Sequence, residues 1–169
     1  MNVQLNSLFS TSDTLVDELD LEPVAFKLQL EHGWSLDRVN HAIRQYRLWL
    51  KMIARYPDVS IIPNKEVDEA WHTHILDTRK YAVDCDRIFG HFLHHFPYFG
   101  MRGAEDRHDL HTAFAKSQSM MMEAFGENLC SYVDENSDGA LCGPENCDPQ
   151  IYTDDRRPRL REDGLKLVA

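Results

Sequence analysis

The fold is decided by residues 35–57, SLDRVNHAIRQYRLWLKMIARYP, which carry the signals of one long amphipathic helix. Ser35 is a favourable N-cap, because its hydroxyl can accept a hydrogen bond from a backbone N–H of the first turn. Tyr56 and Pro57 end the helix, since the residue before a proline avoids the helical conformation. The apolar residues between these limits recur every three or four positions and share one face: Val39, Ala42, Ile43, Tyr46, Trp49, Leu50 and Ile53. Such a face predicts a helix that packs against other helices.

The segment before this helix predicts more helical structure. Residues 1–12 are polar with few apolar anchors, so we expect a flexible N-terminus. From Asp13 onward apolar residues recur at helical spacing, and the pattern continues beyond Pro23. Gly33 ends it, because glycine readily takes the left-handed conformation that closes a helix. The sequence therefore predicts a helix that begins near residue 13 and ends at Gly33.

Two helices are predicted directly after the short apolar loop that follows Pro57. Asn64 can cap a helix over residues 65–76, and Asp77 can cap the next one, from Thr78 to Phe89. Gly90 interrupts this second helix. Both carry the histidine-rich part of the chain.

The remaining elements complete the predicted fold. Residues 91–96 are typical of one or two more helical turns, which Pro97 ends. A last helix is expected from about Gly103 to Phe125. Because no segment alternates apolar and polar residues as a strand would, we predict an all-α fold. It is a single compact bundle of about five helices over residues 13–125.

Residues 126–169 have a different composition, rich in acids and turn-forming residues, and predict an irregular acidic tail. Three of the four cysteines of the chain lie in this tail. Their spacing lacks the paired CxxC motifs of zinc ribbons. We therefore interpret them as ordinary thiols of a loosely constrained segment.

The tail also contains a possible calcium loop. Asp134, Asn136 and Asp138 alternate, Gly139 follows, and Glu145 completes the spacing of an EF-hand loop. Oxygen side chains at every second position can wrap a cation, and the distal carboxylate can close the shell. Nearby prolines leave no exit helix, however, and no second loop is present as a partner. An acidic tail with an accidental spacing is the favoured interpretation, and calcium binding is the alternative.

Charge and composition restrict the partners. The formal net charge is -10, which disfavours nucleic acids and anionic membranes because both are polyanionic. No stretch approaches the ~20 apolar residues of a membrane span, and the first residues lack the features of a secretory signal. We therefore expect a cytoplasmic protein that binds neither nucleic acid nor membrane. A protein partner or a small-molecule substrate stays open, as does the oligomeric state.

Candidate metal ligands gather in residues 66–100, EVDEAWHTHILDTRKYAVDCDRIFGHFLHHFPYFG. Asp68 and His72 are four residues apart, so one helical face presents both. His94 or His95, from a later turn, can complete the site. One carboxylate with two or three imidazoles suits iron, zinc or manganese, and leaves positions open for water or substrate. The pattern thus predicts a metal centre built from these four residues.

Four more residues are expected around this centre. His74 lies about 200° around the helix from His72, so we expect it to bond to Asp77 or Thr78 rather than to a shared ion. Tyr81 and Cys85, also four residues apart, are expected near the site as supporting or reactive groups.

Two functions follow from these patterns. The first is a metalloenzyme, either an oxidoreductase or a hydrolase. The second is a non-catalytic interaction module or scaffold, in which the histidines are ordinary core or surface residues. In that case an aromatic series forms the core and a docking surface: Phe89, Phe92, Phe96, Tyr98 and Phe99. The sequence holds no nucleophile elbow, P-loop or dinucleotide fingerprint.

The string VDEAWHTHILDTRKYAVDCDRIFGHFLHHFPYFG resembles the signature of the glycine-rich-domain-containing-protein-like family, a domain of unknown function in plants, fungi and bacteria. The resemblance is close over residues 66–100 and looser over about 35–62. It implies a shared domain and a shared site, but no reaction. The chain has 8 glycines and no glycine-rich tract, and so lacks the feature that names the family.

Overall fold

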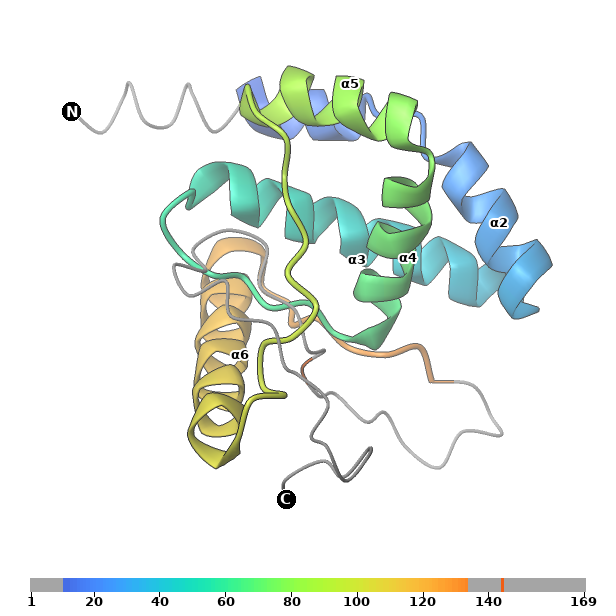
Figure 1. Ribbon diagram of the computed structural model, residues 1–169. Helices are drawn as coiled ribbons and strands as arrows, with labels where there is room; N and C mark the ends of the chain where they lie inside the picture. Colours follow the sequence, from blue (N-terminus) through green and yellow to red (C-terminus); the bar gives the residue numbers. More distant parts are fainter. Residues whose placement is uncertain (1–10, 134–143, 145–169) are drawn as a thin grey trace, which may run out of the picture.

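The computed structural model describes residues 11–133 and 144, and within them the regular structure is helical, with no strand (Figure 1). The predicted all-α fold is confirmed. The labelled helices are α2 (Glu22–His32), α3 (Leu36–Arg55), α4 (Lys65–Leu76), α5 (Thr78–Phe89) and α6 (Ala104–Phe125). A short helical segment, residues 11–17, precedes α2. Among the described residues, no helix has the length and apolar composition that crossing a membrane requires.

The N-terminal helix differs from the prediction, because it is two helices rather than one. The chain leaves the helical conformation between the segment 11–17 and α2. Pro23 lies in the first turn of α2, where its missing N–H costs nothing. Just before it, the Asp20 carboxylate accepts a hydrogen bond from the Glu22 N–H at 3.1 Å. Leu19 and Leu21 are both buried in the core, so the bend is anchored by packing as well.

The helical turns expected over residues 91–96 are absent. Gly90 ends α5 in the left-handed conformation, with φ of +72°. In a helix, the Leu93 carbonyl would accept the backbone N–H of Pro97, four residues later, but proline has no N–H to donate. The Leu93 carbonyl accepts the Tyr81 hydroxyl instead, at 2.7 Å. The chain therefore crosses from α5 to α6 as an irregular segment, residues 90–103, which we call the connector.

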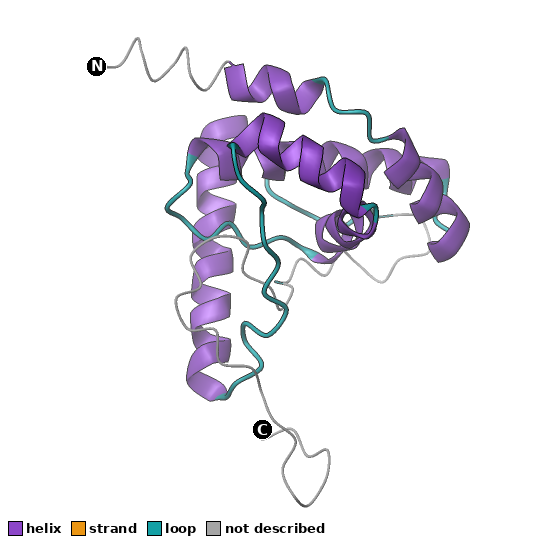
Figure 2. Cartoon of the chain, turned by 45° about the horizontal axis from the view of Figure 1, so that its top comes forward, coloured by secondary structure: helices purple, strands orange, loops and turns teal. Residues whose placement is uncertain are grey.

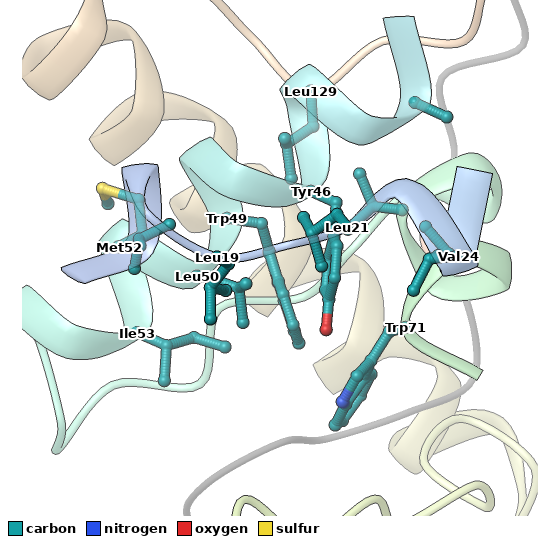
Figure 3. Close-up of a cluster of buried hydrophobic side chains, with 14 of the residues drawn as sticks. Leu19, Leu21, Val24, Tyr46, Trp49, Leu50, Met52, Ile53, Trp71 and Leu129 are labelled. Atoms are coloured by element: carbon teal, nitrogen blue, oxygen red, sulfur yellow. The ribbon is translucent and has the colours of Figure 1, made fainter. Parts of the chain in front are cut away.

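Helix α3 is at the centre of the core, as its apolar face predicts. Trp49 and Tyr46 of α3 are fully buried, and Figure 3 shows them beside Trp71 of α4. The ring centroids of Trp49 and Trp71 are 4.7 Å apart. The Trp49 indole N–H donates to the Ile61 carbonyl at 2.7 Å. Helix α4 packs against α2, α3 and α5. The helix that carries Asp68 and His72 is thus held on three sides.

Helix α6 runs across α3 rather than alongside it (Figures 1 and 2). It joins the other helices partly through the loops between them. The Ile62 N–H donates to the Ser117 hydroxyl at 2.9 Å, and Ile62 and Phe99 pack with Leu110 and Phe114 of α6 in a second, smaller apolar cluster. The position of α6 therefore depends on the loop between α3 and α4 and on the connector.

The chain remains attached to the helices after Phe125, where we placed the domain boundary. Residues 127–132, which we call the strap, are irregular but closely packed. Leu129 is fully buried, and Figure 3 shows it in the cluster with Tyr46. The Gln118 side-chain oxygen accepts the Leu129 N–H at 2.9 Å, and the Gln118 side-chain N–H donates to the Leu129 carbonyl at 2.7 Å. Whether the rest of the tail is separable stays a prediction.

Two further contacts fix the end of the strap and one tail residue on α4. The Tyr132 N–H donates to the buried Glu66 carboxylate at 2.9 Å. Pro144 forms an isolated antiparallel bridge with Asn64, the N-cap of α4. The candidate calcium ligands lie outside the described residues, as do two of the tail cysteines: Asp134, Asn136, Asp138, Glu145, Cys142 and Cys147.

Candidate metal centre

Helix α4 presents two of the candidate ligands together. Its start is fixed by Asn64, whose side-chain oxygen accepts the Val67 N–H at 3.0 Å. Val67 and Trp71 are fully buried and set the rotation of the helix about its axis. Asp68 and His72 then share one side at the edge of the core. The His72 Nδ1 lies 3.5 Å from the Asp68 Oδ2.

The third candidate ligand, His95, comes from the connector. Its Nε2 is 3.4 Å from the Asp68 Oδ1 and 2.8 Å from the His72 Nε2. We call Asp68, His72 and His95 the triad. One potential ligand atom from each of the three residues lies within 4.8 Å of the others, so the triad could hold a metal ion. It joins two elements that are separated by the whole of α5.

The spacing of the triad suits one small ion. Tetrahedral ligands at ~2.0–2.1 Å from an ion lie ~3.3 Å from each other, and octahedral neighbours ~2.9 Å. The separations of 2.8 and 3.4 Å that His95 makes are each within about 0.1 Å of one of these two values. In the absence of an ion, one of the two facing imidazole nitrogens donates a proton to the other. An ion held there would take the place of that proton and would be bound by the lone pairs of both nitrogens.

The triad is partly open to solvent. The side chains of Asp68 and His95 are 10% and 12% exposed, whereas that of His72 is 44% exposed. A structural zinc site normally has four protein ligands and no access to water. Three ligands with one open side are typical of a centre that also binds water or a substrate.

His94 is not part of the triad, although the sequence left His94 and His95 as alternatives. Its side chain is exposed, and its ring packs against Phe92 with centroids 4.9 Å apart. The connector is irregular here, and the two adjacent histidines have different neighbours: His94 packs on Phe92, whereas His95 packs on Trp71 and His72. The nearby His91 bonds to the Phe89 carbonyl at 3.0 Å and also lies apart from the triad.

Comparison with known proteins identifies the family. The UCP032817-like family matches residues 21–121, more than half of the 169 residues. The chain belongs to the UCP032817-like family. The matched span begins just before α2, reaches into α6 and contains the whole triad.

A longer plant protein is related to this UCP032817-like chain. Glycine-rich domain-containing protein 1 of Arabidopsis thaliana is 28% identical over 108 residues, which are 62% of this chain and 13% of the relative. The chain thus spans only a small part of that protein's length. The predicted resemblance to glycine-rich-domain-containing proteins is confirmed. No solved structure matches the chain.

In this UCP032817-like chain, His74 does not bond to the partners that the sequence predicted. Its Nε2 lies 3.0 Å from the Asp84 carboxylate, and its Nδ1 lies 3.0 Å from the Tyr46 hydroxyl. Because a carboxylate only accepts, the Nε2 carries the proton and the Nδ1 accepts from Tyr46. Burial lowers the pKa of His74, and the attraction of Asp84 offsets this only in part. His74 is therefore a neutral core residue that joins α3, α4 and α5.

The expected bond from His74 to Asp77 or Thr78 is wrong, because both ring nitrogens of His74 already bond to Asp84 and Tyr46. Asp77 leaves the helical conformation, and its backbone N–H, not its carboxylate, bonds to the His74 carbonyl at 3.1 Å. The Asp77 side chain instead caps α5, where it accepts the Lys80 N–H at 3.4 Å.

Neither Tyr81 nor Cys85 belongs to the triad. The Tyr81 hydroxyl accepts the Trp71 indole N–H at 2.8 Å, and the Trp71 ring packs on His95 with centroids 4.5 Å apart. Cys85 is buried, and burial raises the pKa of its thiol. A neutral thiol is a poor metal ligand. Tyr81 thus contacts the site through Trp71.

Three residues that matter here were not singled out for the site from the sequence: Trp71, Tyr46 and Asp84. Trp71 looks like an ordinary core residue, since nothing local shows that its ring touches a histidine 24 positions later. Asp84 does carry one signal, because it lies four residues after Lys80 and pairs with it at 2.8 Å. That spacing indicates a helical ion pair but does not reveal the contact with His74.

Proposed function

We propose that this chain is a metal-binding protein whose ion is held by the triad of Asp68, His72 and His95. The observation that carries the proposal is the convergence of one carboxylate and two imidazoles, from α4 and from the connector, within 4.8 Å. Two histidines and one carboxylate form the ligand set of mononuclear iron and zinc enzymes. Iron or zinc is therefore the expected metal, and manganese suits the same donors.

A catalytic role follows from the open side of the site. With three protein ligands, an ion keeps positions for water or substrate, which His72 leaves accessible. Zinc lowers the pKa of a bound water and supports hydrolysis, whereas iron supports oxidation by dioxygen. We therefore propose a metalloenzyme, an oxidoreductase if iron is bound and a hydrolase if zinc is bound.

The alternative, an interaction module built on the aromatic series, has less support from the fold. Phe99 belongs to the second apolar cluster, and Phe89 packs against the main core. Only Phe92 of the series is a markedly exposed large hydrophobic residue, at 40%. A single exposed ring is ordinary for a folded protein.

The deciding experiment is elemental analysis of the full chain purified without a metal-affinity tag. We expect close to one equivalent of iron, zinc or manganese in the wild-type protein. His95→Ala and Asp68→Ala should each lose most of it, because each removes one of three ligands. His94→Ala is the matched control, since this neighbouring histidine is exposed and outside the triad.

Two outcomes would contradict the proposal. One is a folded wild-type protein that stays free of metal even after incubation with Fe²⁺, Zn²⁺ or Mn²⁺. The other is an equal loss of metal from His94→Ala and His95→Ala, which would mean that the site is not the triad. The first result would favour the interaction module.

A further inference from the structure

His95 is the triad residue with the least local support, because it lies in the irregular connector. A ligand on a helix is held by backbone hydrogen bonds along its length, but the connector has no such ladder between residues 91 and 95. Its main anchor next to His95 is Leu93, whose side chain is 1% exposed. The Leu93 carbonyl accepts the Tyr81 hydroxyl at 2.7 Å.

The same hydroxyl also holds the helix that carries the other two ligands. It accepts the Trp71 indole N–H at 2.8 Å. Trp71 directly precedes His72 in α4, and its ring lies against that of His95, with centroids 4.5 Å apart. One buried oxygen therefore links α5, α4 and the connector.

The direction of both bonds is fixed by chemistry. An indole N–H only donates and a carbonyl only accepts, so the hydroxyl must accept from Trp71 and donate to Leu93. Burial raises the pKa of Tyr81, which keeps the proton needed for the second bond in place. A phenylalanine at this position would leave two buried polar groups without partners.

We propose that Tyr81 is a positioning residue for the His95 ligand, and that its hydroxyl sets the metal affinity of the triad by fixing Leu93 and Trp71. This inference rests on the proposed function, that is, on metal binding by Asp68, His72 and His95. Tyr81 does not contact the ion itself. Groups that orient a ligand in this way typically change metal affinity by about 10–100-fold.

The test compares two buried tyrosines. Tyr81→Phe removes the hydroxyl that links the connector to α4. Tyr46→Phe is the matched control, because Tyr46 is equally buried and its hydroxyl bonds to His74, not to the connector. Affinity for Zn²⁺ is measured by competition with a chromophoric chelator, and thermal stability is measured separately on the metal-free proteins.

We expect Tyr81→Phe to weaken Zn²⁺ binding by about 10-fold or more, while Tyr46→Phe binds as the wild type does. Both variants should melt at lower temperature, since Tyr46→Phe loses one buried hydrogen bond and Tyr81→Phe loses two. With Co²⁺ as a spectroscopic probe, only Tyr81→Phe should show altered visible absorption. Wild-type affinity in Tyr81→Phe, or equal weakening in both variants, would overturn the positioning role.

Failure of this inference can be told apart from failure of the proposed function. If wild type binds Zn²⁺, His95→Ala does not and Tyr81→Phe binds normally, only the role of Tyr81 is wrong. If His95→Ala binds as tightly as the wild type, the triad itself is wrong.

A second variant covers the case in which Tyr81→Phe does not fold. Phe92→Ala removes a 40% exposed ring whose centroid lies 5.1 Å from that of Tyr81. This change should weaken Zn²⁺ binding severalfold by loosening the Tyr81 ring. Unchanged affinity would overturn the proposal.

Discussion

Replacing Leu129 with alanine tests whether the strap belongs to the folded unit. Leu129 is fully buried, and replacing a buried leucine with alanine costs about 2–5 kcal/mol of unfolding free energy, depending on how far the site can collapse. The Gln118 amide holds both backbone groups of Leu129, so the backbone cannot move in to fill the cavity. We therefore expect a loss of about 3–5 kcal/mol. That is a large part of the stability of a typical domain.

The assay is urea denaturation followed by tryptophan fluorescence and far-ultraviolet circular dichroism. Val133→Ala is the control, because Val133 is 54% exposed and should change the unfolding free energy by less than about 0.5 kcal/mol. Chains that end after Phe125 or after Val133 extend the comparison. The shorter chain loses Leu129 and also leaves the buried Gln45 amide without the Cys130 N–H, which donates to its oxygen at 3.3 Å. If Leu129→Ala were as stable as Val133→Ala, the packing of the strap described above would be wrong.

Two further predictions concern residues away from the triad. His74→Ala should lower the unfolding free energy by about 2–4 kcal/mol, because it leaves a cavity and the buried Tyr46 hydroxyl loses its acceptor. Elemental analysis should still find metal in the folded variant. Loss of the metal would place His74 in the site. Burial acts to raise the pKa of Asp106, but hydrogen bonds and charge from Arg102 outweigh it and lower that pKa. Asp106 therefore stabilises the fold above the ordinary aspartate pKa of about 4, and this stabilisation is lost as pH falls through the lowered value. In urea denaturation at a series of pH values, Asp106→Asn should flatten the acid side of the stability curve, and an unchanged curve would refute the assignment.

Most of the helical fold was predictable because its signals are local. Ser35, Asn64 and Asp77 cap α3, α4 and α5 as expected, each with a side-chain oxygen that accepts a backbone N–H of the first turn. The apolar face of α3 became the centre of the core. The pairing of Asp68 with His72 also follows from helical geometry alone, since residues four apart share a face.

The errors arose where distant residues decide the backbone. Residues 91–96 have a helical composition, yet the Tyr81 hydroxyl takes the Leu93 carbonyl and Pro97 offers no N–H in return. The strap has a turn-rich sequence, yet amides from α3 and α6 bond to its backbone. No periodicity within either segment reveals such contacts.

The order of residues is enough to show which ligand types are available and that one helix presents both Asp68 and His72, because the α-helix repeats every 3.6 residues whatever surrounds it. That His95 rather than His94 faces them depends on how the helices and the connector pack. The two histidines are adjacent in an irregular segment that has no periodicity of its own. Their directions are set by Leu93, Trp71 and Tyr81, which come together only when α4, α5 and the connector pack.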